Sequence, residues 1–209
     1  MRRPIVAGNW KMHKTAAEAV ELVEGIKPLV AGLDVEVVVC PPFTCLETVR
    51  AVLADSAIEL GAQNMHWERQ GAFTGEISSD MLLAAGCSYV LLGHSERRQF
   101  CGEDDSLVNR KLACSLQAGL CPIVCVGETL QEREAGRIEE VVLGQVSGAI
   151  AGIEAGAVSA VVWAYEPVWA IGTGVTATAA QAEEVHAMIR YFLAGHLGKA
   201  AADEVRIQY

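Results

Sequence analysis

The sequence predicts an α/β fold of alternating parallel strands and helices, and within that class it favours a closed barrel. Short apolar, β-branched runs recur seven times, amphipathic stretches separate them, and the runs are nearly continuous in apolar residues. Continuous apolar runs are typical of parallel strands that are covered on both faces, whereas half-exposed strands alternate. With 209 residues, of which 52% are hydrophobic, the chain can bury one sizeable core. We therefore expect a single domain over residues 1–209.

The expected strands and helices follow from local patterns in chain order. Two helices have readable starts, because residues 15–18 and 178–181 both have the capping-box pattern of a threonine followed three residues later by Glu or Gln. The apolar positions that follow the second box recur every three or four residues and predict a core-facing stripe: Ala182, Val185, Ile189 and Phe192. The expected strands lie near residues 5–7, 35–40, 58–62, 89–92, 122–126, 158–165 and 205–209.

Polar residues directly after several strands favour a barrel over an open doubly wound sheet. The open sheet normally carries a G-x-G-x-x-G turn or a phosphate loop ending in Gly-Lys-Ser/Thr, and the sequence has neither. Instead, Asn9 and Lys11 follow the first expected strand, and further polar residues follow the fourth, fifth and sixth: His94, Ser95 and Glu96, then Glu128, then Glu166. The carboxyl ends of barrel strands converge on one mouth, so these distant residues are expected to become neighbours.

The segment AYEPVWAIGTG, from Ala164 to Gly174, is the most informative part of the chain. A buried strand delivers the carboxylate of Glu166 to its carboxyl end, and Pro167 stiffens the departure into a loop with an apolar tip. Gly172 and Gly174 let the backbone bend sharply or approach an anion closely. A base beneath a water-excluding lid is one interpretation. On this segment alone, an ordinary strand-to-helix connection with a solvated Glu fits equally well.

Charge and cysteine usage exclude several classes of partner. The formal net charge is −10, with sixteen scattered Lys and Arg, which argues against nucleic-acid binding. No segment approaches the roughly 18 apolar residues of a membrane span. The seven cysteines form no C-x-x-C pair, and their odd number fits a disulfide framework poorly. We expect a cytoplasmic protein with no structural metal.

The motifs of the chain resemble those of one family, the triosephosphate isomerases. The similarity runs in order through AGNWKMH, CPPFTCL, GAQNM, GAFTGEIS, YVLLGHSERRQF, CVGETLQERE, AYEPVWAIGTG and RIQY. It implies a (β/α)8 TIM barrel that interconverts dihydroxyacetone phosphate and D-glyceraldehyde 3-phosphate through an enediolate, without metal or organic cofactor. It also implies a role in glycolysis and gluconeogenesis.

The resemblance assigns the proton transfers to two residues, and the family is itself a standard example of both roles. Glu166 matches the base that takes a proton from one carbon and returns it to the next. His94 matches the neutral imidazole that stabilises the developing oxyanion. Residues 95–98 can start a short helix, whose amino end disfavours a positively charged ring. Taken alone, a histidine after a strand is more often structural.

Further residues are assigned to substrate binding and support. Lys11 matches the fixed positive charge beside the phosphate and the enediolate, and Asn9 matches a hydrogen-bonding neighbour. Glu96 resembles a carboxylate that orients Lys11 or the neighbouring loop. Ser95 resembles a residue that holds the carboxylate of the base in the open form. Gly172 is expected to offer its backbone N–H to the phosphate.

The resemblance also implies a homodimer. Residues 71–76, GAFTGE, match a loop that reaches into the neighbouring subunit. Thr74 of one subunit is expected to approach Asn9 and Glu96 of the partner subunit. Without the resemblance, the same segment is a Gly-rich surface turn.

The sequence departs from the family at its end. Similar proteins continue after RIQY with a Gly-Gly-Ser phosphate loop and an eighth strand, whereas this sequence ends at Tyr209. We expect a TIM barrel cut short after the seventh strand, lacking its C-terminal βα units and greatly weakened as an isomerase. Two alternatives stay open: a catalytically silent phosphate-binding or assembly module, and an aldolase-like enzyme with Lys11 as Schiff-base nucleophile.

Overall fold

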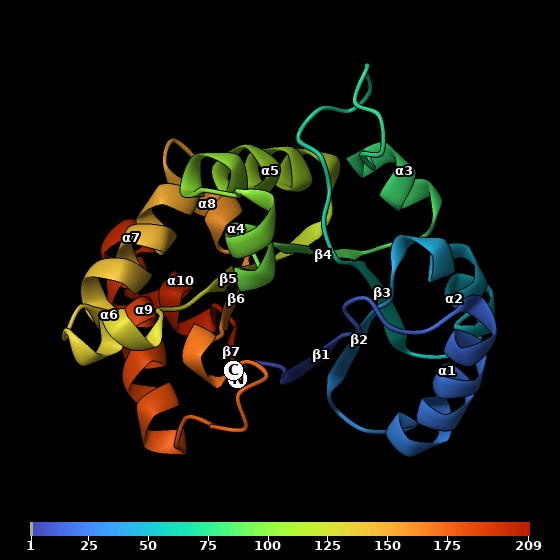
Figure 1. Cartoon of the computed structure of the whole chain (residues 1–209), viewed down its shortest axis with the longest axis horizontal. Coiled ribbons are helices and arrows are strands. Elements are labelled where there is room, and N and C mark those ends of the chain that lie inside the picture. The colour runs from blue at the N-terminus through green and yellow to red at the C-terminus, as the bar shows by residue number, and fades with distance from the viewer. Residues whose placement is uncertain (1) are drawn as a thin grey trace. The chain divides into compact units, whose positions relative to one another are not determined.

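The computed structural model describes residues 2–209, in which helices and strands alternate along the chain (Figure 1). The strands are β1 (Ile5–Asn9), β2 (Glu36–Cys40), β3 (Ile58–Ala62), β4 (Tyr89–Leu92), β5 (Cys121–Val126), β6 (Val162–Tyr165) and β7 (Ile207–Gln208). The helices are α1 (Ala16–Val30), α2 (Leu46–Val52), α3 (Ser79–Ala84), α4 (Ser95–Cys101), α5 (Asp105–Ala118), α6 (Leu130–Glu134), α7 (Ile138–Ile150), α8 (Ala155–Val158), α9 (Ala179–Leu197) and α10 (Lys199–Glu204), with two 3-10 turns, η1 (Phe43–Cys45) and η2 (Val168–Ala170).

The chain divides into two compact units. The first contains the residues up to Leu92 together with Cys114–Pro122, and the second contains Gly93–Ala113 and Ile123–Tyr209. The expectation of one domain over residues 1–209 is not decided by this division and stays a prediction.

The first unit is built on parallel strands in chain order. β1 pairs with β2, β2 with β3 and β3 with β4, each in parallel register. Its core is apolar, and Val38 of β2 and Val90 of β4 are fully buried. Gly61 of β3 marks a close approach, because a Cβ there would lie only 2.6 Å from the Sγ of Cys40. A side chain at position 61 would therefore push β2 and β3 apart.

The second unit repeats the pattern with the later strands. Ile123 to Val126 of β5 pair in parallel with β6, and β6 pairs in parallel with β7. Trp163 and Tyr165 of β6 are fully buried, so this short strand supplies the largest core side chains of the unit. The near-continuous burial of β5 and β6 explains why their sequences do not alternate.

Both predicted capping boxes are present. Thr178 N–H donates to Gln181 Oε1 at 2.9 Å while Gln181 N–H donates to Thr178 Oγ1 at 3.2 Å, and Thr15 forms the matching box with Glu18. In α9 the predicted apolar stripe is confirmed at Val185 and Ile189, which are buried. The stripe ends at Leu193, which is buried. Phe192, the position predicted from sequence, is partly exposed.

The predicted start of the sixth strand was wrong. Residues 155–158 form α8, a turn follows, and β6 begins only at Val162. A short apolar run fits a buried helical turn as well as a strand, so periodicity alone could not separate the two. Within residues 2–209, none of the helices has the length and apolar character needed to cross a bilayer.

Candidate functional site

In the second unit, the sequence-predicted base and electrophile face each other. His94 follows β4 after one glycine, and Glu166 directly follows β6. His94 Nε2 lies 3.2 Å from Glu166 Oε2, and the exposed fractions of the two side chains are 6% and 27%. An imidazole and a carboxylate that are 72 residues apart in sequence thus share one small, mostly buried site.

The hydrogen bond at the other ring nitrogen fixes the tautomer of His94. The backbone N–H of Glu96 donates to His94 Nδ1 at 3.2 Å, so His94 caps the amino end of α4 with its own ring. A nitrogen that accepts a hydrogen bond carries no proton, and in a neutral imidazole the proton then lies on Nε2. His94 therefore presents an N–H donor on the side that faces Glu166. The Glu96 carboxylate stands 3.5 Å from Nδ1.

One oxygen of the Glu166 carboxylate is buried without a hydrogen-bond donor among the described residues. Its Oε2 is buried and, among the described residues, accepts no hydrogen bond, so the 3.2 Å approach to His94 is close but not aligned. Most buried polar atoms are satisfied, and an exception calls for an explanation. A buried carboxylate oxygen with no donor bound to it is suited to accept a proton from a ligand.

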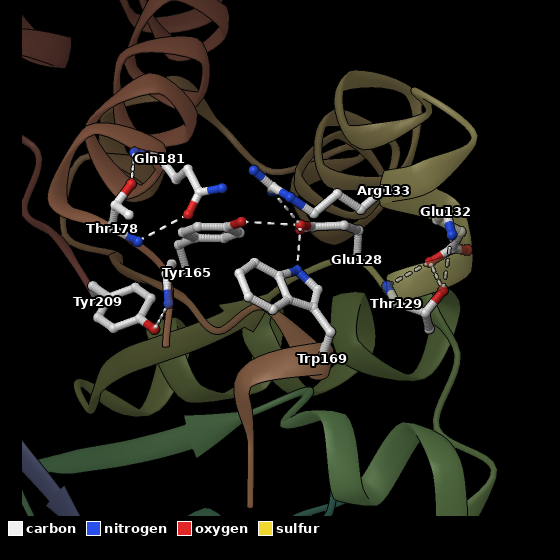
Figure 2. A network of polar contacts seen from close by, with 10 residues as sticks. Glu128, Thr129, Glu132, Arg133, Tyr165, Trp169, Thr178, Gln181 and Tyr209 are labelled. Atoms are coloured by element: carbon white, nitrogen blue, oxygen red, sulfur yellow. Dashed lines mark hydrogen bonds and ion pairs between the residues drawn. The ribbon is translucent and has the colours of Figure 1, made fainter. Parts of the chain in front are cut away.

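A buried carboxylate network ties the segment after Glu166 to α6 (Figure 2). Glu128 is fully buried, and its Oε1 accepts from Trp169 Nε1 at 2.9 Å, Tyr165 Oη at 3.1 Å and Arg133 Nη1 at 2.9 Å. The Arg133 guanidinium also lies 5.0 Å from the centre of the Trp169 ring. The apolar tip predicted from sequence is thus held through the polar edge of its tryptophan.

Burial, together with the adjacent Glu128 carboxylate, raises the pKa of Tyr165 above its ordinary value. The phenol therefore stays protonated and continues to donate to Glu128 across the neutral range. Glu128 was predicted among the polar residues at the mouth, but its network with Tyr165 and Trp169 was not predicted. A sequence signal for the network is a Glu two residues before a short helix that carries Arg133.

The far end of the loop that follows Glu166 is held by Tyr209, next to β7. Ala177 N–H donates to the hydroxyl of Tyr209 at 3.2 Å (Figure 2). Thr173 Oγ1 donates to the Trp169 carbonyl at 2.8 Å. Between them, Gly172 and Gly174 have φ angles of 69° and 78°, a region that L side chains rarely adopt. The two glycines were predicted as bending points, and the backbone confirms this.

A cavity of about 400 Å³ adjoins Glu166 within the second unit. Ser95, Gly127, Gln145 and Val168 contribute to its lining together with Glu166. Ser95, which was predicted to hold the Glu166 carboxylate in the open form, therefore borders the same space as Glu166.

In the first unit, Asn9 and Lys11 come together at the end of β1. Lys11 N–H donates to Asn9 Oδ1 at 3.0 Å, and Gln63 Nε2 donates to the carbonyls of both Lys11, at 2.9 Å, and Cys40, at 2.8 Å. Lys11 has a φ of 52°, which is uncommon for a residue other than glycine. Such strain costs about 1–3 kcal/mol and concentrates at functional positions. The sequence analysis missed the supporting role of Gln63, although it lies in the family-like GAQNM motif.

The predicted dimer residue Thr74 lies in an exposed turn of the first unit. Glu76 N–H donates to the Phe73 carbonyl at 3.0 Å and closes the turn, while the Phe73 ring packs 4.2 Å from the ring of His66. The proximity of Thr74 to a partner subunit stays a prediction, as does the convergence of Lys11 with His94 and Glu166. Among the described residues, no cluster of three or more His, Cys, Asp or Glu is arranged to hold a metal ion.

Comparison with known proteins supports the resemblance drawn from the motifs. A model of the family described as triosephosphate isomerase matches residues 4–209. The chain is 56% identical to the triosephosphate isomerases of Herpetosiphon aurantiacus and Moorella thermoacetica and 53% identical to that of Citrifermentans bemidjiense. These alignments cover 100% of this chain and 84% of each relative. The matches confirm the family resemblance and the predicted TIM-barrel class, of which this chain holds the part through β7.

Proposed function

Because the chain belongs to the triosephosphate isomerase family, we propose that it interconverts dihydroxyacetone phosphate and D-glyceraldehyde 3-phosphate. The observation that carries the mechanism is the Nε2–Oε2 distance of 3.2 Å between His94 and Glu166, with the imidazole proton on the nitrogen that faces the carboxylate. A carboxylate able to accept a proton and a neutral N–H donor are the two groups that enolisation next to a carbonyl requires.

The reaction proceeds by transfer of one proton between adjacent carbons. Glu166 removes a proton from the carbon beside the substrate carbonyl, and the electron pair moves onto the carbonyl oxygen. His94 Nε2–H donates to that oxygen and then helps to move a proton between the two oxygens of the enediolate. Glu166 returns its proton to the neighbouring carbon, which completes the isomerisation with no net change in oxidation state.

Fixed charges and backbone donors hold the substrate. The Lys11 ammonium balances the phosphate and the enediolate, and Asn9 hydrogen-bonds beside it. Gly172 donates its N–H to the phosphate once the loop is closed, and Glu96 orients Lys11 or the loop. The strained backbone of Lys11 and the positive φ of Gly172 support these roles.

The experiment that tests this function is a coupled assay that supplies dihydroxyacetone phosphate and follows the formation of glyceraldehyde 3-phosphate. We expect metal-independent turnover, unchanged after dialysis against a chelator. For the 209-residue polypeptide the expected kcat/KM is far below the diffusional ceiling, a limit for which triosephosphate isomerase is itself a standard example. Phosphate-analogue binding without turnover supports a silent binding module instead, and borohydride trapping of substrate on Lys11 supports an aldolase-like reaction.

We further propose a cytoplasmic homodimer that acts in glycolysis and gluconeogenesis. Met12, next to Lys11, is 94% exposed, and Phe73, next to Thr74, is 42% exposed. Large apolar side chains exposed at these two positions support an interface. Thr74 then rests against Asn9 and Glu96 of the partner subunit.

Dissociation of this dimer is expected to lower activity. Dilution through the dissociation constant should reduce the specific rate in parallel with the weight-average mass, measured by sedimentation in the same buffer. A monomer that keeps the full specific rate contradicts the dimer proposal.

A further inference from the structure

The backbone of Glu166 packs directly against Gly127. A Cβ placed on Gly127 would lie 2.0 Å from the carbonyl oxygen of Glu166, 2.7 Å from its carbonyl carbon and 3.3 Å from the nitrogen of Pro167. Any side chain at position 127 is therefore excluded. Because the two backbones are in contact, the position of the Gly127 peptide limits where the Glu166 backbone can lie.

The residues on either side of Gly127 are hydrogen-bonded to the Glu166 segment, while Gly127 is not. Glu166 N–H donates to the carbonyl of Val126 at 2.8 Å, and Val168 N–H donates to the carbonyl of Glu128 at 2.9 Å. In a parallel ladder, alternate residues direct their backbone groups to opposite neighbours. The N–H and C=O of Gly127 thus point away from β6, just beyond the end of β5 at Val126.

The side chain of Gln145 binds both of these backbone groups. Gly127 N–H donates to Gln145 Oε1 at 2.8 Å, and Gln145 Nε2 donates to the Gly127 carbonyl at 3.2 Å. Gln145 supplies the hydrogen-bond partners that a neighbouring strand would otherwise provide to Gly127. It projects from α7, whose flanking residues Val142 and Val146 are fully buried. The amide is therefore fixed to a helix that is itself anchored in the core.

We propose that Gln145 is a positioning residue for Glu166, acting through the Gly127 peptide. The two hydrogen bonds hold the N–H and the C=O on either side of the Gly127 Cα, so one planar amide fixes the location and the tilt of the Gly127 backbone. The peptide in turn supports the Glu166 carbonyl and sets the reach of its carboxylate toward His94. The inference rests on the proposed function, in which Glu166 is the base.

The test is Gln145→Met, which keeps the length of the side chain and removes both hydrogen bonds. Because a misplacement of about 1 Å costs about 10²-fold in rate, we expect a smaller displacement to lower kcat about 10-fold. KM should change less than about twofold, since phosphate and carbonyl binding are not touched. Gln145→Glu keeps an acceptor for the Gly127 N–H but sets a carboxylate oxygen against the Gly127 carbonyl, so its kcat should also fall below that of the wild type. The matched control is Gln131→Met at an exposed position of α6.

Amide hydrogen exchange supplies a readout that does not depend on turnover. Gln145→Met should speed exchange of the Gly127 and Glu166 amides by about 10-fold or more while leaving the Val124 amide of the core unchanged. Far-UV circular dichroism confirms that each variant is folded. If Gln145→Met does not fold, Gln145→Glu carries the same two measurements.

The outcomes separate this inference from the proposed function. A wild-type chain without isomerase turnover contradicts the function, and the exchange of the Glu166 amide then still decides the positioning link. Loss of Glu166 protection together with a fall in kcat supports the inference when the wild type turns over. Unchanged protection of Glu166, or unchanged kcat despite lost protection, overturns it.

Discussion

Glu166→Asp is expected to lower kcat by about 10²-fold, because removal of one methylene withdraws the carboxylate by about 1 Å from the carbon it must reach. The structure explains why the protein cannot compensate. The Glu166 N–H donates to the Val126 carbonyl at 2.8 Å, and the Glu166 backbone packs against Gly127. The main chain therefore cannot shift toward the substrate to make up for the shorter side chain. The KM is expected to change little, since the charge on Lys11 is untouched.

The measurement is the isomerase rate of wild type and variant with substrate that carries deuterium at the abstracted position. In Glu166→Asp the isotope effect on kcat should increase, because proton abstraction becomes the slow step. Glu184→Asp is the matched control, since Glu184 is exposed on α9 and the same methylene is lost. An unchanged rate for Glu166→Asp would show that another group is the base.

The sequence predicted the strands and placed His94 and Glu166 just beyond strand ends, because both depend on local pattern. A continuous apolar run followed by a polar residue defines a buried strand and its carboxyl end, and that rule located His94 and Glu166. The start of β6 was wrong because the apolar residues before Val162 fit a helical turn equally well.

The supporting contacts could not be predicted from local pattern. Trp169 donates to Glu128 across 41 residues, and Gln63 reaches the Lys11 carbonyl across 52 residues. Each contact depends on how helices and loops pack after the strands have formed. Polar side chains such as Gln145 are common on helix surfaces, and only the three-dimensional path of the chain distinguishes one that binds a backbone peptide.

Lys111→Met is expected to lower the free energy of unfolding by about 3–5 kcal/mol, because it leaves a buried carboxylate short of a cation. Glu103 Oε1 accepts from Arg97 Nε at 2.5 Å and also from Lys111 Nζ. The exposed fractions of the Glu103 and Lys111 side chains are 3% and 4%. The cluster joins α4 to α5, and α4 is the helix whose amino end His94 caps.

The control for this variant is Lys199→Met. Lys199 pairs with Asp203 at 2.7 Å, but its side chain is 83% exposed, so the loss should be about 1 kcal/mol or less. Urea unfolding followed by circular dichroism measures both variants. Equal destabilisation by the two substitutions would contradict the claim that burial of Glu103 sets the cost.

The same cluster predicts how the effect of Lys111→Met depends on pH. Burial raises the pKa of Glu103, but the hydrogen bonds from Lys111 and Arg97 outweigh burial and hold the pKa below its ordinary value. A lowered pKa contributes stability that is present above the unfolded-state value of about 4.3 and is lost as the pH falls through the folded-state value. Without Lys111, the carboxyl is protonated more easily. The destabilisation by Lys111→Met should therefore be largest near pH 7 and shrink toward pH 4, because a neutral Glu103 carboxyl no longer needs the charge of Lys111 in addition to that of Arg97. Urea midpoints at the two pH values measure this difference, and a constant difference would mean that Lys111 stabilises the protein by packing alone.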